Sequence, residues 1–222
     1  MKWNIPNILT LLRLVAAPGV AVMFLYFTRP YADALAMFLF IAAAVTDWFD
    51  GYLARAWGQE TKLGTMLDPI ADKAMVVIAL MVIVAFSSWS PWLVLPATVI
   101  LFREVFVSGL REFLGDVSGT LKVTALAKWK TTAQMVAIAV LFGQGLFEHY
   151  FGMSIFGMDN ALVGAILSGE EEDVLGLTWK FHGMIWAGRI GLVLLWIAAA
   201  LTAITGYDYL RKSMPHLVEP RE

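Results

Sequence analysis

The chain of 222 residues contains no cysteine, and charged residues make up only 15 % of it. Without cysteine there can be no disulfide framework, no thiolate metal site and no cysteine nucleophile. Hydrophobic residues make up 59 % of the chain, whereas soluble domains contain about 45–50 %. This composition excludes a soluble enzyme and indicates an integral membrane protein.

Six stretches are long and apolar enough to cross a bilayer, which takes about 20 residues. They cover residues 8–27, 33–55, 66–86, 91–112, 131–150 and 183–206. Turn-forming residues such as Arg29-Pro30 and Ser90-Pro91 separate them. We therefore expect an all-α integral membrane protein with six transmembrane helices, forming one domain over residues 1–222. We also expect the first helix to be retained, because no clear small-residue cleavage site stands near the start.

The basic residues are distributed unevenly between the two sides of this six-helix arrangement. Three of them fall on one side, namely Arg29, Lys180 and Arg189. The other side receives Lys2, Arg13, Arg55, Lys62, Lys73, Arg103, Arg111, Lys122, Lys128, Lys130, Arg211 and Lys212. Because cytoplasmic loops carry the excess of Lys and Arg, we expect both termini and the active site to be cytoplasmic.

The longest connection, residues 151–182, falls on the extracytoplasmic side and contains the acidic run Glu170 to Asp173. Acidic runs usually mark solvated surface. We therefore expect a solvated loop, with a short interfacial helix as the alternative.

Four aspartates lie within the apolar part of the chain, at Asp47, Asp50, Asp68 and Asp72. Each carboxylate at a helix centre costs roughly 2.5–3.5 kcal/mol on insertion scales, so packing alone does not account for four of them. Residues three or four apart share a helix face, which orients the four as two pairs. Two facing pairs would form a cage for hard divalent cations, and two-metal sites suit phosphoryl displacement.

Small residues and one arginine accompany these aspartates. Gly51 and Ala54 leave room for a ligand to approach the helix, and Arg55 could hold a phosphate through its planar guanidinium. Gly64 permits a turn or a close approach at the start of the third helix. Pro69 either sits near the first helical turn or kinks the helix and frees a carbonyl.

The pattern Asp47-x2-Asp50-Gly51-x2-Ala54-Arg55-x8-Gly64-x3-Asp68-x3-Asp72 resembles the motif of the CDP-alcohol phosphotransferase family at every fixed position. The resemblance implies six transmembrane helices, a cytoplasmic site with two Mg²⁺ or Mn²⁺ ions, and a homodimer. It implies that the four aspartates bind metal and that Gly51, Ala54, Arg55 and Gly64 line the CDP pocket.

The resemblance also makes Asp72 the catalytic base that takes the proton of the attacking hydroxyl. The residues present agree with this assignment. An attacking alcohol needs a base within hydrogen-bond reach. The three histidines, His149, His182 and His216, lie at the outer side of the membrane or in the tail, so a carboxylate must do that work.

A second group of basic residues points to a phosphorylated acceptor. Arg103 and Arg111 are eight residues apart, so they lie within about 20–30° of each other on one helix face. Lys128 and Lys130 open the fifth predicted helix, and Lys128 is our narrow choice between the two. Snorkelling toward anionic lipid head groups is the alternative explanation for such residues. We expect Glu104 and Glu112 to pair with basic residues rather than to bind metal.

Three segments resemble the phosphatidylglycerophosphate synthase branch of the family. They are Asn4 to Arg13, Arg103 to Glu112 and Lys128 to Gln134. This resemblance implies that Arg103, Arg111 and one of the two lysines bind the phosphate of glycerol 3-phosphate. It also implies that Asn7 and Thr10 help to hold the cytidine diphosphate. For Arg13, snorkelling and a place in the site are equally supported.

The expected reaction transfers the phosphatidyl group of CDP-diacylglycerol to sn-glycerol 3-phosphate, through attack by the glycerol 1-hydroxyl, and releases CMP. Inositol phosphate or phosphatidylglycerol as acceptor is the alternative within the same chemistry. A divalent-cation transporter that uses the carboxylates as its path is the alternative from another class. We expect membrane lipid as a partner, no nucleic acid, and a multi-pass place in the bacterial inner membrane.

Overall fold

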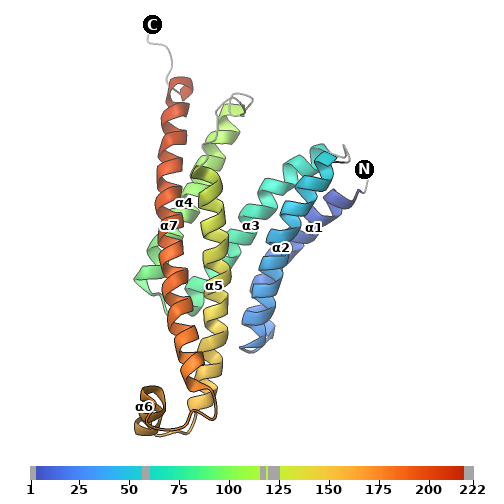
Figure 1. The fold of residues 1–222 in the computed structure, drawn as a ribbon. Coiled ribbons are helices and arrows are strands. Elements are labelled where there is room, and N and C mark those ends of the chain that lie inside the picture. The colour runs from blue at the N-terminus through green and yellow to red at the C-terminus, as the bar shows by residue number, and fades with distance from the viewer. Residues whose placement is uncertain (1–3, 57–60, 116–118, 120–125, 218–222) are drawn as a thin grey trace. The chain divides into compact units, whose positions relative to one another are not determined.

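The computed structural model describes residues 4–56, 61–115, 119 and 126–217, without the side chains at 6, 48–56, 127 and 128. Within this part of the chain the secondary structure is helical and contains no strand. The helices are α1 (Ile5–Tyr26), α2 (Tyr31–Ala56), α3 (Lys62–Phe86), α4 (Pro91–Leu114), α5 (Leu126–Ile155), α6 (Asn160–Ser168) and α7 (Leu177–Leu217). Figure 1 shows them in chain order.

All six predicted spans are helices. Their observed ends match the predicted ones or lie up to eleven residues outside them, except that α1 ends at Tyr26, one residue before its predicted end. Five of them, α1, α3, α4, α5 and α7, are long and apolar enough to cross a membrane, as judged on the described residues. The second predicted span, α2, is a continuous helix of 26 residues but is not one of these five. The number of six spans and their orientation stay predictions.

The chain divides into two compact units. Unit 1 consists of Met1–Ile83 and Ile138–Gly191, and unit 2 of Val84–Ala137 and Leu192–Glu222. The division therefore falls within α3, α5 and α7, so each of these helices contributes one part to each unit. Whether residues 1–222 act as a single transmembrane domain stays a prediction.

Small residues bring the helices of unit 1 together. Ala17 of α1 and Ala32 and Ala36 of α2 are completely buried, and small side chains let membrane helices approach closely. An aromatic cluster joins α5 to this pair, since the ring of Phe142 lies 6.0 Å from that of Phe24 and 6.3 Å from that of Phe40. These contacts fix the amino-terminal helices that carry the predicted metal ligands.

Unit 2 is held by α4 and the second part of α7. The indole N–H of Trp196 donates to the carbonyl of Trp92 at 3.0 Å, and the two rings lie 6.3 Å apart. Ile100 of α4 and Leu195 and Ala198 of α7 are fully buried. The helix α4 thereby holds Arg103 and Arg111 on a packed support.

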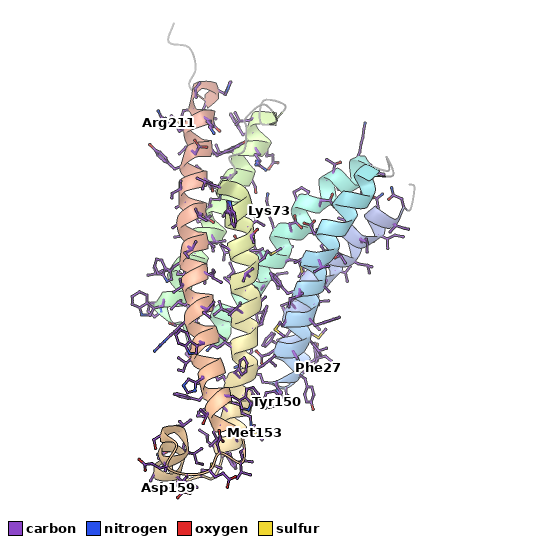
Figure 2. The ribbon with its side chains drawn as sticks, viewed as in Figure 1. Phe27, Lys73, Tyr150, Met153, Asp159 and Arg211 are labelled. Carbon is purple, nitrogen blue, oxygen red and sulfur yellow. The ribbon has the colours of Figure 1, made fainter. Side chains whose placement is uncertain are left out.

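The expectation of a solvated loop at 151–182 was wrong, because most of this segment is helical. The helix α5 continues to Ile155, α6 follows, and α7 begins at Leu177. Figure 2 shows Met153 near the end of α5 and Asp159 at the start of α6. The apolar run of α6 (Asn160–Ser168) explains the difference, since an acidic run that begins two residues after the end of this helix does not prevent a helix there.

Part of the acidic run has a structural role. The Asp173 carboxylate accepts the backbone N–H of Leu177 at 2.6 Å and that of Thr178 at 2.8 Å. These are among the first N–H groups of α7, which have no partner inside the helix. The hydrogen bond from the Thr178 backbone, and then that from Leu177, lowers the pKa of Asp173 below its ordinary value. Asp173 therefore caps the longest helix of the chain.

Candidate active site

Three of the predicted metal ligands meet at one arginine of α1. The Arg13 side chain is only 2 % exposed, and its Nη1 donates to Oδ1 of Asp72 at 2.8 Å. Nη1 also pairs with Oδ1 of Asp47, and Nη2 lies 3.6 Å from Oδ1 of Asp68. The carboxylates come from α2 and α3, which run beside α1 within unit 1 (Figure 1). The predicted convergence therefore holds for these three aspartates.

Helix geometry accounts for this arrangement. Asp68 and Asp72 are four residues apart on α3 and so lie on one face, while Asp47 reaches them from α2. Asp50 follows Asp47 by three residues on α2, but its side chain lies outside the described residues. Pro69 lies inside α3 rather than in its first turn. Since proline has no N–H, it cannot donate to the carbonyl one turn earlier.

Two residues of α1 were predicted to hold the cytidine diphosphate. One contacts α3, and the other contacts the residue that precedes α3. The buried Thr10 hydroxyl donates to Oδ1 of Asp68 at 2.6 Å. The Thr61 hydroxyl donates to Oδ1 of Asn7 at 2.7 Å. Both contacts join the start of α1 to the start of α3. Thr10 thereby fixes the position of one predicted metal ligand.

Gly64 allows this close approach. A Cβ atom at Gly64 would lie 2.9 Å from Oδ1 of Asn7 and 3.3 Å from Oγ1 of Thr61. Its backbone N–H also donates to the Thr61 hydroxyl at 3.1 Å. An open pocket of about 470 Å³ lies beside it, lined by Thr61, Lys62, Thr65 and Met66. The predicted close approach at the entry to α3 is confirmed.

The remaining predicted CDP ligands are placed by their backbone alone. Gly51, Ala54 and Arg55 lie in the last two turns of α2, and their side chains lie outside the described residues. The spacing of Asp50 and Ala54 by four residues on one helix places them on one face. The role of these residues in nucleotide binding stays a prediction.

The donor set of unit 1 fits a hard divalent cation. Among the side chains that the structure describes, no group of three or more Asp, Glu or His is arranged to hold a metal ion, and Arg13 lies between the three carboxylates. These carboxylates are 40–44 % exposed, so solvent and ions can reach them. Three negative charges face one positive charge, and hard cations prefer such oxygen ligands.

In unit 2, Glu104 of α4 pairs with two of the predicted acceptor ligands. Nη1 of Arg103 lies 3.3 Å from Oε1 of Glu104, and Nζ of Lys130 pairs with the same oxygen. All three side chains are nearly buried. The expectation that Glu104 pairs with basic residues is confirmed. The side chain of Lys128 lies outside the described residues, so the choice between the two lysines stays open.

The other predicted acceptor ligand, Arg111, lies two turns further along α4. Its guanidinium carbon lies 5.3 Å from the centre of the Tyr209 ring on α7, a cation–π contact. The structure therefore brings Arg103 together with Lys130 through Glu104, and it supports Arg111 from α7.

Two features of these sites were not identified from the sequence. An arginine near the start of a span fits snorkelling as well as a site, and only its contacts with α2 and α3 place Arg13 among the aspartates. The face of α7 formed by Thr202, Thr205, Tyr209 and Ser213 is buried. The signal was present as polar residues at helical spacing, but it extends beyond the predicted end of the span at residue 206.

Comparison with known proteins decides the family. The sequence profile of CDP-alcohol phosphatidyltransferase matches residues 3–169. This chain is a CDP-alcohol phosphatidyltransferase family member. The resemblance carried by the pattern from Asp47 to Asp72 is thereby confirmed.

Three relatives of this family member share one name. A protein of Cereibacter sphaeroides is 62 % identical over 222 residues, which is 100 % of both chains, and is named CDP-diacylglycerol–glycerol-3-phosphate 3-phosphatidyltransferase. Proteins of Salmonella choleraesuis and Shigella flexneri with the same name are 41 % identical over 160 residues, covering 70 % of this chain and 86 % of theirs. The similarity to the Cereibacter protein includes the part after residue 150.

Proposed function

We propose that this protein transfers the phosphatidyl group of CDP-diacylglycerol to sn-glycerol 3-phosphate and releases CMP. The observation that carries the proposal is the meeting of Asp47, Asp68 and Asp72 at one cationic position in unit 1. Family membership and the full-length relative named for this reaction support it. The chemistry is a displacement at phosphorus in which an alcohol attacks and a nucleotide leaves.

The proposed cofactor is a pair of Mg²⁺ or Mn²⁺ ions held by Asp47, Asp50, Asp68 and Asp72. Two bound cations stabilise the charge on the attacking and leaving oxygens of such a displacement. Within the chain, Thr10 holds Asp68 through its 2.6 Å hydrogen bond. Arg13 orients Asp72 and Asp47 from the opposite helix. The carboxylates are thereby fixed before substrate binds, which avoids reorganisation during the reaction.

Asp72 is the proposed general base. Its carboxylate takes the proton of the glycerol 1-hydroxyl while that oxygen forms a bond to the lipid-side phosphorus. The bond from this phosphorus to the CMP oxygen breaks, and CMP leaves with the electron pair. The 2.8 Å contact of Arg13 with Oδ1 of Asp72 fixes the direction of the carboxylate, and general-base catalysis depends on that geometry.

The proposed CDP pocket uses Gly51, Ala54, Arg55, Gly64, Asn7 and Thr10. The open pocket beside Gly64 supports this placement, because its volume of about 470 Å³ lies within the roughly 300–1,000 Å³ range of small-molecule sites. Because Gly64 carries no side chain, Asn7 and Thr61 lie close against the start of α3 beside this pocket. Arg55 would contribute a planar cation for the diphosphate.

The proposed acceptor ligands are Arg103, Arg111 and one of Lys128 and Lys130. The arrangement of Arg103 and Lys130 about Glu104 supports this assignment. Two cations that share one carboxylate oxygen keep an excess of positive charge for a dianionic phosphate. The planar fork of an arginine together with the ammonium of a lysine suits phosphate recognition.

We further propose six transmembrane helices with both termini on the cytoplasmic side, a homodimer, and a place in the bacterial inner membrane. The 26 residues of α2 extend about 39 Å at 1.5 Å per residue, enough to cross a hydrocarbon core of about 30 Å. At the other end of unit 1, the exposed Phe156 and Val174 on either side of α6 suit an interfacial position for this helix. Cysteine-accessibility labelling at the two termini tests the orientation.

A panel of acceptors tests the proposed reaction. The purified protein in detergent receives CDP-diacylglycerol, Mg²⁺ and equal amounts of glycerol 3-phosphate, inositol phosphate and phosphatidylglycerol, and the lipid products are separated. We expect the glycerol 3-phosphate product to dominate. A dominant inositol phosphate product would keep the aspartate assignment and refute the acceptor assignment. Ion flux in proteoliposomes without any lipid product would favour the transporter.

A further inference from the structure

Unit 2 holds a group of buried polar atoms that lack a hydrogen-bond partner. Five such side-chain atoms occur among the described residues, and four of them lie in unit 2. These four are Nε of Arg103, Oε1 of Gln134, Oγ1 of Thr202 and the hydroxyl of Tyr209. An unsatisfied buried donor or acceptor is destabilising, so four in one unit call for an explanation.

The four atoms belong to three helices around the predicted acceptor ligands. On α7, Thr202, Gly206 and Tyr209 recur at a spacing of four and three residues and so share one face. This face meets α4, because a Cβ atom at Gly206 would lie 2.8 Å from Cγ of Arg103. One turn along α7 from Gly206, the Tyr209 ring lies 5.3 Å from the guanidinium carbon of Arg111. Both predicted arginines therefore contact the same face of α7.

The third side is provided by α5. Lys130 reaches Glu104, the neighbour of Arg103 in sequence. Gln134 follows Lys130 by one turn and lies on the same face of α5. Gln134 is buried. The face of α5 that carries Lys130 and Gln134 is thus the face directed toward Arg103 and Glu104.

We propose that Tyr209 and Gln134 complete the acceptor pocket, with the Tyr209 hydroxyl donating to the phosphate of the acceptor and the Gln134 carbonyl oxygen accepting from a hydroxyl of its glycerol. This inference rests on the proposed function, because it names further ligands of the same substrate. The Nε–H of Arg103 donates to the phosphate in the same pocket.

The chemistry of the unpartnered atoms favours this class of ligand. The Arg103 and Tyr209 atoms are donors, and a phosphate offers several acceptor oxygens to them. The Gln134 atom is an acceptor, and a polyhydroxylated carbon chain offers donors to it. A purely apolar ligand, such as an acyl chain, would leave all of these atoms unsatisfied. A small phosphorylated polyol satisfies both kinds at once.

Gly206 keeps the space that Arg103 needs. The contact of 2.8 Å that a Cβ would make with Cγ of Arg103 is shorter than real Cβ atoms tolerate. The arginine would have to move, and its Nε would move with it. Gly206 is therefore a positioning residue for Arg103 rather than a ligand.

The test compares two tyrosines of α7. Tyr209 is buried, whereas Tyr207 is 70 % exposed, two residues away on the same helix. Tyr209→Phe removes only the hydroxyl and keeps the ring under Arg111, and Tyr207→Phe is the matched control. CMP release is measured as a function of glycerol 3-phosphate concentration at saturating CDP-diacylglycerol. It is also measured as a function of CDP-diacylglycerol concentration at saturating glycerol 3-phosphate. Binding of glycerol 3-phosphate is measured independently by thermal shift in detergent.

We expect Tyr209→Phe to raise the KM for glycerol 3-phosphate roughly tenfold. The concentration of glycerol 3-phosphate that gives a half-maximal thermal shift should rise by roughly the same factor. The KM for CDP-diacylglycerol should stay unchanged, and Tyr207→Phe should resemble the original protein in both measurements. Gln134→Met should raise the same KM without changing that for the lipid. Unchanged KM and binding in Tyr209→Phe, or equal changes for both substrates, would overturn the inference.

The design separates this inference from the proposed function. If the original protein releases no CMP with glycerol 3-phosphate, the proposed function fails before any variant is compared. If it does release CMP and Tyr209→Phe behaves as Tyr207→Phe does, only the inference fails. Should Tyr209→Phe lose its folded state, as judged by thermal unfolding without substrate, Gly206→Ala and Gln134→Met decide the question by the same two KM values.

Discussion

Replacing Arg13 with glutamine tests how the aspartates are held in the absence of metal. The guanidinium is 2 % exposed and faces three carboxylates that are 40–44 % exposed. Because the carboxylates are partly solvated, each pair is worth about 0.5–1 kcal/mol rather than the value of a fully buried pair. Three pairs then contribute roughly 2 kcal/mol. At about 2–4 °C per kcal/mol for a chain of this size, Arg13→Gln should lower the Tm in EDTA by about 4–8 °C.

Added Mg²⁺ should have the opposite effect on this variant. Without the guanidinium, a divalent cation no longer competes with an internal charge for the same oxygens. A tenfold tighter Kd adds about 1.4 kcal/mol of stabilisation at saturation. The rise in Tm between EDTA and Mg²⁺ should therefore be about 3–5 °C larger in Arg13→Gln than in the original protein.

Thermal unfolding of purified protein in detergent, monitored by tryptophan fluorescence, measures both quantities. Arg211→Gln is the control, because Arg211 lies exposed on α7 in unit 2 (Figure 2). Arg13→Lys keeps the charge without the planar fork, so its Tm in EDTA and its Mg²⁺ shift should lie between those of Arg13→Gln and those of the original protein. An equal or smaller Mg²⁺ shift in Arg13→Gln than in the original protein would refute the reasoning that Arg13 and the metal share the aspartates.

Three further predictions concern other parts of unit 1. Asp72→Asn should keep the fold and the binding of CDP-diacylglycerol but abolish CMP release; normal turnover in this variant would refute the base assignment. Gly64→Ala should place a Cβ 2.9 Å from Oδ1 of Asn7 and raise the KM for CDP-diacylglycerol, and an unchanged KM would show that α1 and α3 need no close approach. The backbone hydrogen bonds that the Asp173 carboxylate accepts lower its pKa. The stabilisation by Asp173 is therefore complete above the ordinary pKa of 3.8 and is lost as the pH falls through the lower pKa of the folded state. Unfolding measured between about pH 5 and pH 2 should therefore depend less on pH in Asp173→Asn; an unchanged profile would contradict the cap.

The sequence predicted the helices well, because the bilayer requires long apolar runs and turn residues interrupt them. Its errors have physical causes. The helix α7 extends to Leu217 because contacts of Tyr209 and Ser213 within unit 2 stabilise residues that hydropathy does not distinguish. The helix α6 was expected to be loop because the acidic run beside it dominated the local composition, whereas its own nine residues are apolar.

For the site, spacing alone predicted that the aspartates face one another, since a helix fixes which residues share a face. Spacing could not place Arg13, because its partners lie 34 and 59 residues away. Nor could it assign Thr10 to Asp68, which is 58 residues distant. The unpartnered atoms of Gln134 and Tyr209 become visible only when the packing of α4, α5 and α7 shows that no described residue of unit 2 satisfies them.

The central claim, a metal-dependent transfer to glycerol 3-phosphate, is tested most directly by CMP release from purified protein supplied with CDP-diacylglycerol. The account predicts release that requires both Mg²⁺ or Mn²⁺ and glycerol 3-phosphate, and that stops when EDTA is added. Release that continues in EDTA, or that does not depend on glycerol 3-phosphate, from protein shown to be folded would contradict it.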